Sequence, residues 1–201
     1  MKLVAISDIH GNTAALNDAK KVIKKVKPDV VVVCGDITHT GDADDAILVL
    51  RNIEGLAPIL YVWGNMDHVS RDLQLPLKDV RCIHGQLVTL SGVDFLGLSA
   101  RYDPSILTKF SRGSNPMVVV SHEPPYRCCD KAWSGLHAGS KPLREFVEAQ
   151  QPELVFCGHI HESRGKCTLG DTIVVNVGKC SQGVAVATIG KGQVSVELVS
   201  Y

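Results

Sequence analysis

Five short apolar runs in the chain are each followed at once by residues that can bind a metal ion. Runs of this length that are rich in β-branched residues are typical of buried strands. They cover residues 3–7, 30–34, 59–63, 117–121 and 154–157. The metal-binding residues that follow them are Asp8, His10, Asp36, Asn65, His122, His159 and His161. Because ligands of open α/β sheets bind beyond the carboxyl ends of the strands, the pattern predicts one shared polar site.

Segments with the apolar spacing of helices lie between the runs. Helices are predicted over residues 13–26, 42–53 and 140–149. Asn12 or Thr13, Asp42 and Ser140 are suitable N-cap residues for them. Strands that alternate with helices predict βαβ units with a parallel sheet, so the fold class is α/β.

The rest of the chain is richer in predicted strands. Residues 86–98, with Ser91-Gly92 at the centre, predict a hairpin. The C-terminal region predicts an antiparallel meander of strands 172–177, 184–189 and 194–199, with a turn at 190–192. Since neither an internal repeat nor a low-complexity linker divides the sequence, we expect a single domain over residues 1–201.

The composition limits the expected binding partners of the protein and its expected cellular compartment. The formal net charge is zero, so the overall charge attracts neither nucleic acid nor an anionic membrane, and we expect neither as a partner. An apolar run long enough for a membrane span is absent from the sequence, and the N-terminus does not resemble a signal peptide. The seven cysteines include no CxxC pair, which favours reduced thiols in a cytoplasmic protein. The adjacent Cys128 and Cys129 leave a redox or metal-binding role open.

The number and type of the candidate ligands predict two metal ions. Asp8 and His10 are two residues apart, as are His159 and His161, so in extended segments each pair points to one side. Seven oxygen and nitrogen ligands are more than one tetrahedral ion needs, and they suit two ions about 3.5–4 Å apart. Carboxylates, imidazoles and an amide without thiolate favour Mn, Fe, Zn, Co or Ni.

Such a pair of ions is suited to the hydrolysis of phosphate esters. Metal binding can lower the pKa of water from 15.7 to about 7, so a hydroxide bridging the ions could attack phosphorus in line. The cations would offset the negative charge on the phosphate oxygens. Asp36 is the natural bridging ligand, because a carboxylate has two oxygens to share.

These blocks of residues, taken together, resemble the calcineurin-like metallophosphoesterases. The similarity rests on Asp8-Ile9-His10, Gly35-Asp36, Gly64-Asn65-Met66-Asp67, Ser121-His122 and Gly158-His159-Ile160-His161. The order of the blocks matches, as does their placement after apolar strands, and Asn176-Val177-Gly178 looks like the short turn that follows them. The resemblance implies two facing mixed β-sheets flanked by helices, a four-layer α/β/β/α sandwich.

The resemblance also implies a distribution of the ligands and a class of substrate. Asp8, His10, Asp36 and His161 would hold one ion, and Asp36, Asn65, His122 and His159 the other. Asn65 is counted as a catalytic residue as well as a ligand, and Mn is the favoured metal. The expected substrate is a small-molecule phosphate ester. The sequence does not indicate an oligomeric state.

The chain departs from the family pattern at Met66. Many members carry a histidine there, which is thought to protonate the leaving group or to touch the phosphate, whereas a thioether cannot donate a proton. Small prokaryotic-type members, mostly assigned as phosphodiesterases, also replace this histidine, and the chain resembles that branch. His39 and His137 are predicted to bind substrate, and His68 is a further candidate acid.

The leading hypothesis is a metal-dependent phosphoesterase that acts on diesters. The alternatives are a phosphomonoesterase or protein phosphatase of the same chemistry, and a non-catalytic scaffold with the same fold. Two further residues, Asp67 and His84, also receive predictions. Asp67 is either a carboxylate that orients a histidine or a helix cap, and His84 is expected at the surface.

Overall fold

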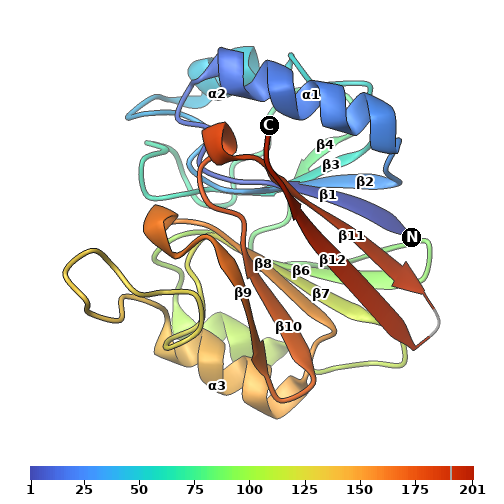
Figure 1. The fold of residues 1–201 in the computed structure, drawn as a ribbon, viewed down its shortest axis with the longest axis vertical. Coiled ribbons are helices and arrows are strands. Elements are labelled where there is room, and N and C mark those ends of the chain that lie inside the picture. Colours follow the sequence, from blue (N-terminus) through green and yellow to red (C-terminus); the bar gives the residue numbers. More distant parts are fainter. Residues whose placement is uncertain (191) are drawn as a thin grey trace.

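Two six-stranded sheets lie face to face in the computed structural model, which describes residues 1–190 and 192–201 (Figure 1). The first sheet has the order β12-β11-β1-β2-β3-β4, and the second has the order β5-β6-β7-β8-β10-β9. The strands of the first sheet are β1 (Lys2–Ile6), β2 (Val30–Cys34), β3 (Ile59–Val62), β4 (Val80–Cys82), β11 (Val184–Gly190) and β12 (Gln193–Val199). Those of the second are β5 (Leu87–Leu90), β6 (Val93–Leu98), β7 (Met117–Ser121), β8 (Leu154–Cys157), β9 (Gly165–Leu169) and β10 (Thr172–Asn176).

Helices cover the outer faces of both sheets. Helices α1 (Thr13–Val26) and α2 (Ala43–Leu50) lie over the first sheet, and α3 (Lys141–Gln150) lies over the second (Figure 1). Short 3₁₀ turns are η1 (Pro104–Lys109), η2 (His161–Ser163) and η3 (Cys180–Gln182). Each sheet has parallel central strands and antiparallel strands at an edge. The predicted four-layer α/β/β/α fold class is therefore confirmed.

Strand β2 shows how alternation builds the layers. Its five residues are all buried, but successive side chains point to opposite faces of the sheet. Val31 and Val33 pack in the apolar cluster under α1 and α2, whereas Val30 and Val32 pack in the cluster between the two sheets. A further cluster fills the space between the second sheet and α3. A strand buried on both faces is thus a continuous apolar run in sequence.

The predicted helices are present, with one shorter than expected. Helix α1 has the predicted bounds, and Asn12 caps it by accepting a hydrogen bond from the Ala15 amide at 3.0 Å. Asp42 caps α2, which ends at Leu50 rather than at residue 53. Asn52 explains the early end, because its side-chain amide donates to the carbonyls of Leu48 and Val49, at 3.0 Å each.

The hairpin at 86–98 is confirmed, and so is the antiparallel pairing of the last two strands of the predicted C-terminal meander, but the placement of its first strand is wrong. Strand β10 joins the second sheet, where it pairs with β8 and β9, while β11 and β12 join the first sheet next to β1. The reason is that β10 is largely buried, and its place between β8 and β9 covers both its edges and faces. The turn predicted at 190–192 includes Lys191, which lies outside the described residues. Among the helices that are described, none has the length and apolar character needed to cross a membrane.

Candidate metal centre

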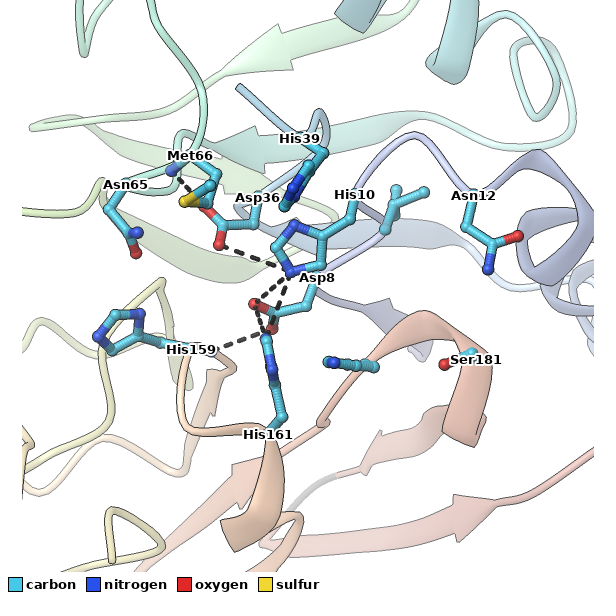
Figure 2. Close-up of a pocket in the computed structure, with 12 residues that line it drawn as sticks. Asp8, His10, Asn12, Asp36, His39, Asn65, Met66, His159, His161 and Ser181 are labelled. Atoms are coloured by element: carbon cyan, nitrogen blue, oxygen red, sulfur yellow. Dashed lines mark hydrogen bonds and ion pairs between the residues drawn. The ribbon is translucent and has the colours of Figure 1, made fainter. Parts of the chain in front are cut away.

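The predicted ligands lie in loops at the carboxyl ends of five strands, drawn from both sheets. Asp8, Asp36 and Asn65 follow β1, β2 and β3 of the first sheet, and His122 and His159 follow β7 and β8 of the second. Together with His10 and His161 they lie around a cavity of about 610 Å³ (Figure 2). Six of these seven residues line the cavity wall, and His122 does not. His122 is instead fully buried beneath it. The structure therefore brings the seven predicted ligands to one place.

The two-residue spacing of the ligands suggested an extended backbone, but the backbone of these loops is not extended. Asp8, His10, Asp36 and His159 have positive φ angles of 50°, 50°, 48° and 66°. The prediction of extended ligand pairs is thus wrong, because β1 and β8 end before their ligands and the chain turns sharply there. A left-handed conformation costs a residue with a Cβ about 1–2 kcal/mol. Such strain persists only where the surroundings fix the backbone, and it is concentrated at functional sites.

One group of donor atoms converges on Asp8. His161 Nε2 lies 2.9 Å from Asp8 Oδ1, and His10 Nε2 lies 3.8 Å from the same oxygen. His10 Nε2 is also 3.8 Å from Asp36 Oδ2 and 3.4 Å from His161 Nε2 (Figure 2). Two imidazole nitrogens and two carboxylates thus face a common point. This donor set fits a divalent transition-metal ion.

A second group forms around His122. Its Nδ1 lies 2.8 Å from the Cys34 carbonyl, a partner that can only accept, so Nδ1 donates and, in the neutral imidazole that binds metals, Nε2 offers the lone pair. Nε2 lies 2.9 Å from Asn65 Oδ1 and 3.6 Å from Asp36 Oδ1. Two acceptor atoms that face each other at hydrogen-bond distance are the arrangement expected of ligands to a cation. The His159 ring lies 4.9 Å from the His122 ring, next to this group.

Asp36 stands between the two groups. Its Oδ1 faces His122 and accepts a hydrogen bond from the Met66 amide at 2.8 Å, while its Oδ2 faces His10. Within the described part of the chain, two sets of carboxylate and imidazole atoms lie within 4.8 Å of one another. They are Asp8, His10 and His161, and Asp8, Asp36 and His122. The residues present therefore fit metal binding, with Asp36 positioned to contribute to both sites.

Burial and hydrogen bonding set the charge of these groups. Burial acts to raise the pKa of Asp8, but the hydrogen bond from His161, the nearby His122 and the hydrogen bond from Ser7 together outweigh it and leave this pKa below its usual value. Burial raises the pKa of Asp36, and the nearby His122 offsets only part of this rise. Burial, together with His122, lowers the pKa of His159 to about 4. An imidazole that stays uncharged near neutral pH keeps a lone pair available for a metal ion.

Asp67 connects two ligand loops, which is neither of its predicted roles. The carboxylate is buried and accepts hydrogen bonds from the Gly64 amide at 2.8 Å, the Thr38 amide at 2.8 Å and the Thr38 hydroxyl at 2.9 Å. It thereby ties the loop that carries Asp36 to the loop that carries Asn65. The histidine-orienting and helix-capping alternatives are both wrong, because the partners are backbone amides of two irregular segments.

Asn176 plays the matching part on the second sheet. Its buried side-chain amide donates to the carbonyls of Ile160 and Cys129, at 2.9 Å each, and its oxygen accepts from the Gly178 amide at 2.9 Å. Ile160 lies between the two ligands His159 and His161. Asn176 therefore fixes the turn that presents both histidines.

Glycines allow the loops to approach the carboxylates closely. A Cβ at Gly64 would collide with the Asp36 carboxylate, and a Cβ at Gly158 would collide with the side chains of Ser7 and Asp8. Any other residue at these two positions would displace a candidate ligand.

The remaining histidines have different surroundings. His39 lines the cavity, with its ring 5.5 Å from that of His10. His137 lies outside the cavity and is held by Asp130, with 2.6 Å between Nδ1 and Oδ1. His68 is exposed in the segment between β3 and β4. His84 was expected at the surface, but it is half-buried, and its Nδ1 accepts a hydrogen bond from the Ser99 amide at 3.0 Å.

Three residues to which the sequence analysis gave no role in the site also line the cavity. They are Asn12, Lys179 and Ser181. Lys179 directly follows the Asn176-Val177-Gly178 turn, so its proximity to that turn was the available signal. Asn12 was recognised only as a helix cap.

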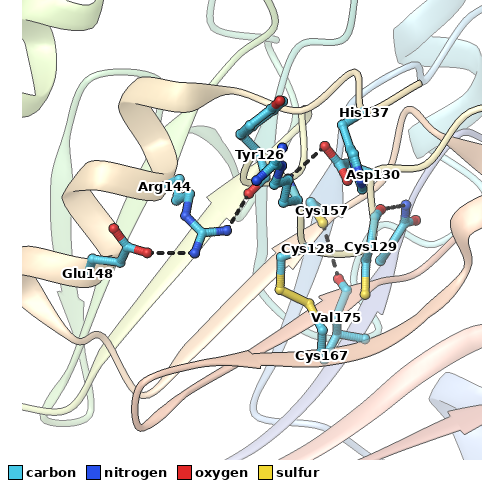
Figure 3. Close-up of a disulfide and its surroundings, with 12 residues drawn as sticks. Tyr126, Cys128, Cys129, Asp130, His137, Arg144, Glu148, Cys157, Cys167 and Val175 are labelled. Atoms are coloured by element: carbon cyan, nitrogen blue, oxygen red, sulfur yellow. Dashed lines mark hydrogen bonds and ion pairs between the residues drawn. A yellow bond between two sulfur atoms is a disulfide. The ribbon is translucent and has the colours of Figure 1, made fainter.

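The expectation of reduced thiols is wrong for two cysteines. Cys128, in the loop after β7, forms a disulfide with Cys167 of β9 (Figure 3). The two residues are 39 positions apart, so the spacing of cysteines in the sequence gave no indication of the pair. The remaining cysteines are free thiols: Cys34, Cys82, Cys129, Cys157 and Cys180. Burial raises the pKa of Cys34 and Cys157, which act as small apolar side chains, as predicted.

Two facing mixed sheets with carboxylates and imidazoles gathered at their strand ends are the features of an α/β protein with a candidate metal centre. Comparison with known proteins identifies the family. The sequence model of the calcineurin-like phosphoesterases matches residues 1–163. The protein MJ1162 of Methanocaldococcus jannaschii is 31% identical over 199 aligned residues, which cover 88% of this chain and 87% of that protein. The chain therefore belongs to the calcineurin-like phosphoesterase family, which is metal-dependent.

Solved structures show the same fold. An archaeal phosphodiesterase aligns with a TM-score of 0.64 at 18% identity, over 99% of this chain and 100% of that one. A dimetal phosphatase from Danio rerio aligns with a TM-score of 0.71 at 14% identity, over 98% of this chain and 95% of that one. At these identities the similarity concerns the fold alone.

Proposed function

We propose that this protein hydrolyses phosphodiesters at a binuclear metal site, and that its described residues form a single domain. The observation that carries the proposal is the position of Asp36, whose two carboxylate oxygens face His122 on one side and His10 on the other. The first ion would be held by Asp8, His10, Asp36 and His161. The second would be held by Asp36, Asn65, His122 and His159. The archaeal phosphodiesterase and the dimetal phosphatase of similar fold support this reading.

Two bound divalent cations, with Mn favoured, would supply a hydroxide near neutral pH and would offset the negative charge of the phosphate. The chain itself orients the ligands. The Cys34 carbonyl fixes the tautomer of His122, and the Asp8 carboxylate fixes His161. Asn65 presents its oxygen beside His122 Nε2, so both would hold the second ion, and we propose that Asn65 also takes part in catalysis. Outer hydrogen bonds of this kind set both the direction and the basicity of metal ligands.

The preference for diesters rests on Met66. This side chain lines the cavity where many family members have a histidine, and it offers neither a proton nor a positive charge. A monoester carries about two negative charges near neutral pH and a diester carries one. The loss of a cationic contact therefore weakens the binding of a monoester more than that of a diester. His39 is the cavity histidine that we propose to contact substrate, whereas for His137 this role stays a prediction.

One observation favours the alternative of a phosphomonoesterase. Lys179 lines the same cavity, and its ammonium group could balance the second charge of a monoester. The complete ligand set speaks against a non-catalytic scaffold. Cytoplasmic location stays a prediction, and the Cys128–Cys167 disulfide removes the cysteine argument for it.

The test is hydrolysis of bis-p-nitrophenyl phosphate and p-nitrophenyl phosphate by protein reconstituted with Mn²⁺, Zn²⁺ or Fe²⁺ in separate samples. We expect the diester to be the better substrate by kcat/KM. A higher kcat/KM for the monoester would overturn the diester preference and favour the alternative. Hydrolysis of neither substrate by protein that holds metal would support the scaffold.

A further inference from the structure

A second cavity adjoins the metal centre on the side of the first two helices. It has a volume of about 320 Å³ and is bordered by residues from the start of α1 and from α2. His10 and His39 line this cavity as well as the metal cavity, so the two spaces meet at these rings. Figure 2 shows His39 beside His10, on the side away from His161. A group attached to a phosphate at the metal centre could therefore extend past His39 into the second cavity.

The α2 side of the second cavity exposes apolar surface. Leu48 of α2 is 64% exposed and lines this cavity, although Ala46, Val49 and Leu50 of the same helix are buried. An exposed leucine at the edge of a cavity next to a candidate active site offers apolar surface to a ligand. Val49 contributes a second apolar side chain to the wall.

Two of the polar side chains that line the second cavity, Thr38 and Asp45, are hydrogen-bonded within the protein. The Thr38 hydroxyl donates to the Asp67 carboxylate and accepts from the Gly41 amide at 3.1 Å. Asp45 accepts a hydrogen bond from the Asp42 amide at 3.3 Å as part of the helix cap. The carboxylate of Asp45 at the wall also disfavours an anionic ligand. The exposed leucine and the Asp45 carboxylate thus favour an uncharged group over an anionic one, and the exposed His39 ring, which lines the same cavity, favours a planar group.

We propose that this second cavity binds an uncharged, ring-bearing arm of a phosphodiester whose phosphate is held at the metal centre. The proposal rests on the proposed function and gives it a substrate class, namely diesters with an aryl or heterocyclic group on one arm. A monoester has no such arm to place beside its leaving group. The cavity is therefore a second feature, independent of Met66, that discriminates between diesters and monoesters.

The test compares the binding of diphenyl phosphate with that of dimethyl phosphate to the Mn²⁺-loaded protein, measured by calorimetry. The two ligands carry the same charged group and differ only in their arms. We expect diphenyl phosphate to bind about tenfold more tightly to the wild type, and Leu48→Asp to bring this ratio close to one. Leu48→Met, which keeps the apolar surface, should retain the ratio. Leu136→Asp is the matched control, since Leu136 is 70% exposed in the loop after β7, outside the cavity.

Inorganic phosphate and metal content separate the second cavity from the metal centre. Leu48→Asp should bind inorganic phosphate and Mn²⁺ as the wild type does, because neither reaches α2. An unchanged ratio of diphenyl to dimethyl phosphate in Leu48→Asp would overturn the proposal, and so would an equal loss of inorganic phosphate binding. Failure of the wild type to hydrolyse bis-p-nitrophenyl phosphate, with the binding ratio intact, would count against the proposed function and not against the second cavity.

Discussion

The loops of the first sheet and those of the second supply ligands to the same centre but are fixed in different ways. In the first sheet, one buried carboxylate, Asp67, gathers backbone amides from the Asp36 and Asn65 loops. In the second, one buried amide, Asn176, donates to the carbonyl between His159 and His161 and to the carbonyl of Cys129. Asp67 accepts hydrogen bonds because the backbone groups that it binds are donors, whereas the side-chain amide of Asn176 donates because the two carbonyls that it binds are acceptors.

The second-sheet loops also depend on a segment that the first sheet lacks. The loop after β7 contacts the η2 turn, where the Trp133 amide donates to Glu162 at 2.7 Å and the Ser163 hydroxyl donates to the Lys131 carbonyl at 2.7 Å. The Cys128–Cys167 disulfide ties this loop to β9 (Figure 3). The position of His161 thus depends on a longer chain of contacts than that of Asp36. Substitutions in the two halves should therefore differ in effect.

The largest effect is expected where the two halves meet. Asp36→Ala removes the carboxylate that faces both groups, and His122→Ala removes a buried ligand of the second sheet. Each should lower kcat/KM by more than about a hundredfold, since loss of even an outer contact commonly costs 10–100-fold. The fold should persist, as judged by circular dichroism. Full activity in both variants would refute the assigned site.

A smaller effect is expected from the first-sheet support. Asp67→Asn places an amide against three donors, so the Asp36 and Asn65 loops lose their common acceptor. Affinity for the second ion should fall about 10–100-fold in a calorimetric titration with Mn²⁺. Asp72→Asn, an exposed change in the same segment, is the control. Equal affinities in Asp67→Asn and the control would show that the two loops hold their positions without Asp67.

The second-sheet support should affect both ions. Asn176→Ala leaves the Ile160 and Cys129 carbonyls without their donor and frees the turn that carries His159 and His161. We expect about a tenfold loss of affinity for each ion, together with about 1–3 kcal/mol of stability. Asn115→Ala, which removes a hydrogen bond to Asp94 far from the centre, is a matched control. Loss of one ion alone would contradict the shared role of Asn176.

The smallest effect on activity is expected from the disulfide. Cys128→Ser combined with Cys167→Ser opens a covalent loop of 39 residues, so thermal unfolding should show a loss of about 2–4 kcal/mol. Hydrolysis should change little, because Asn176 and the η2 contacts remain. Wild-type protein in reductant should behave like the double variant. An inactive but folded double variant would show that the loop after β7 shapes the centre directly.

The layers of the fold could be predicted from sequence because strands buried on both faces leave continuous apolar runs, as in β2. The assignment of β10 to the second sheet could not be predicted, because its sequence pattern is that of any buried strand. Which strands it pairs with is decided by tertiary contacts. Likewise, the ligands were identifiable by their positions after the runs. Their left-handed backbone and the roles of Asp67 and Asn176 depend on which loops face each other, and that information is absent from local sequence.

Metal uptake tests the central claim most directly. Purified chain should be stripped of metal, reconstituted with Mn²⁺, freed of excess ion and analysed for metal content. Two ions per chain in the wild type, with a clear loss in Asp36→Ala, is the result that this account predicts. A wild-type chain that retains no transition metal would contradict it.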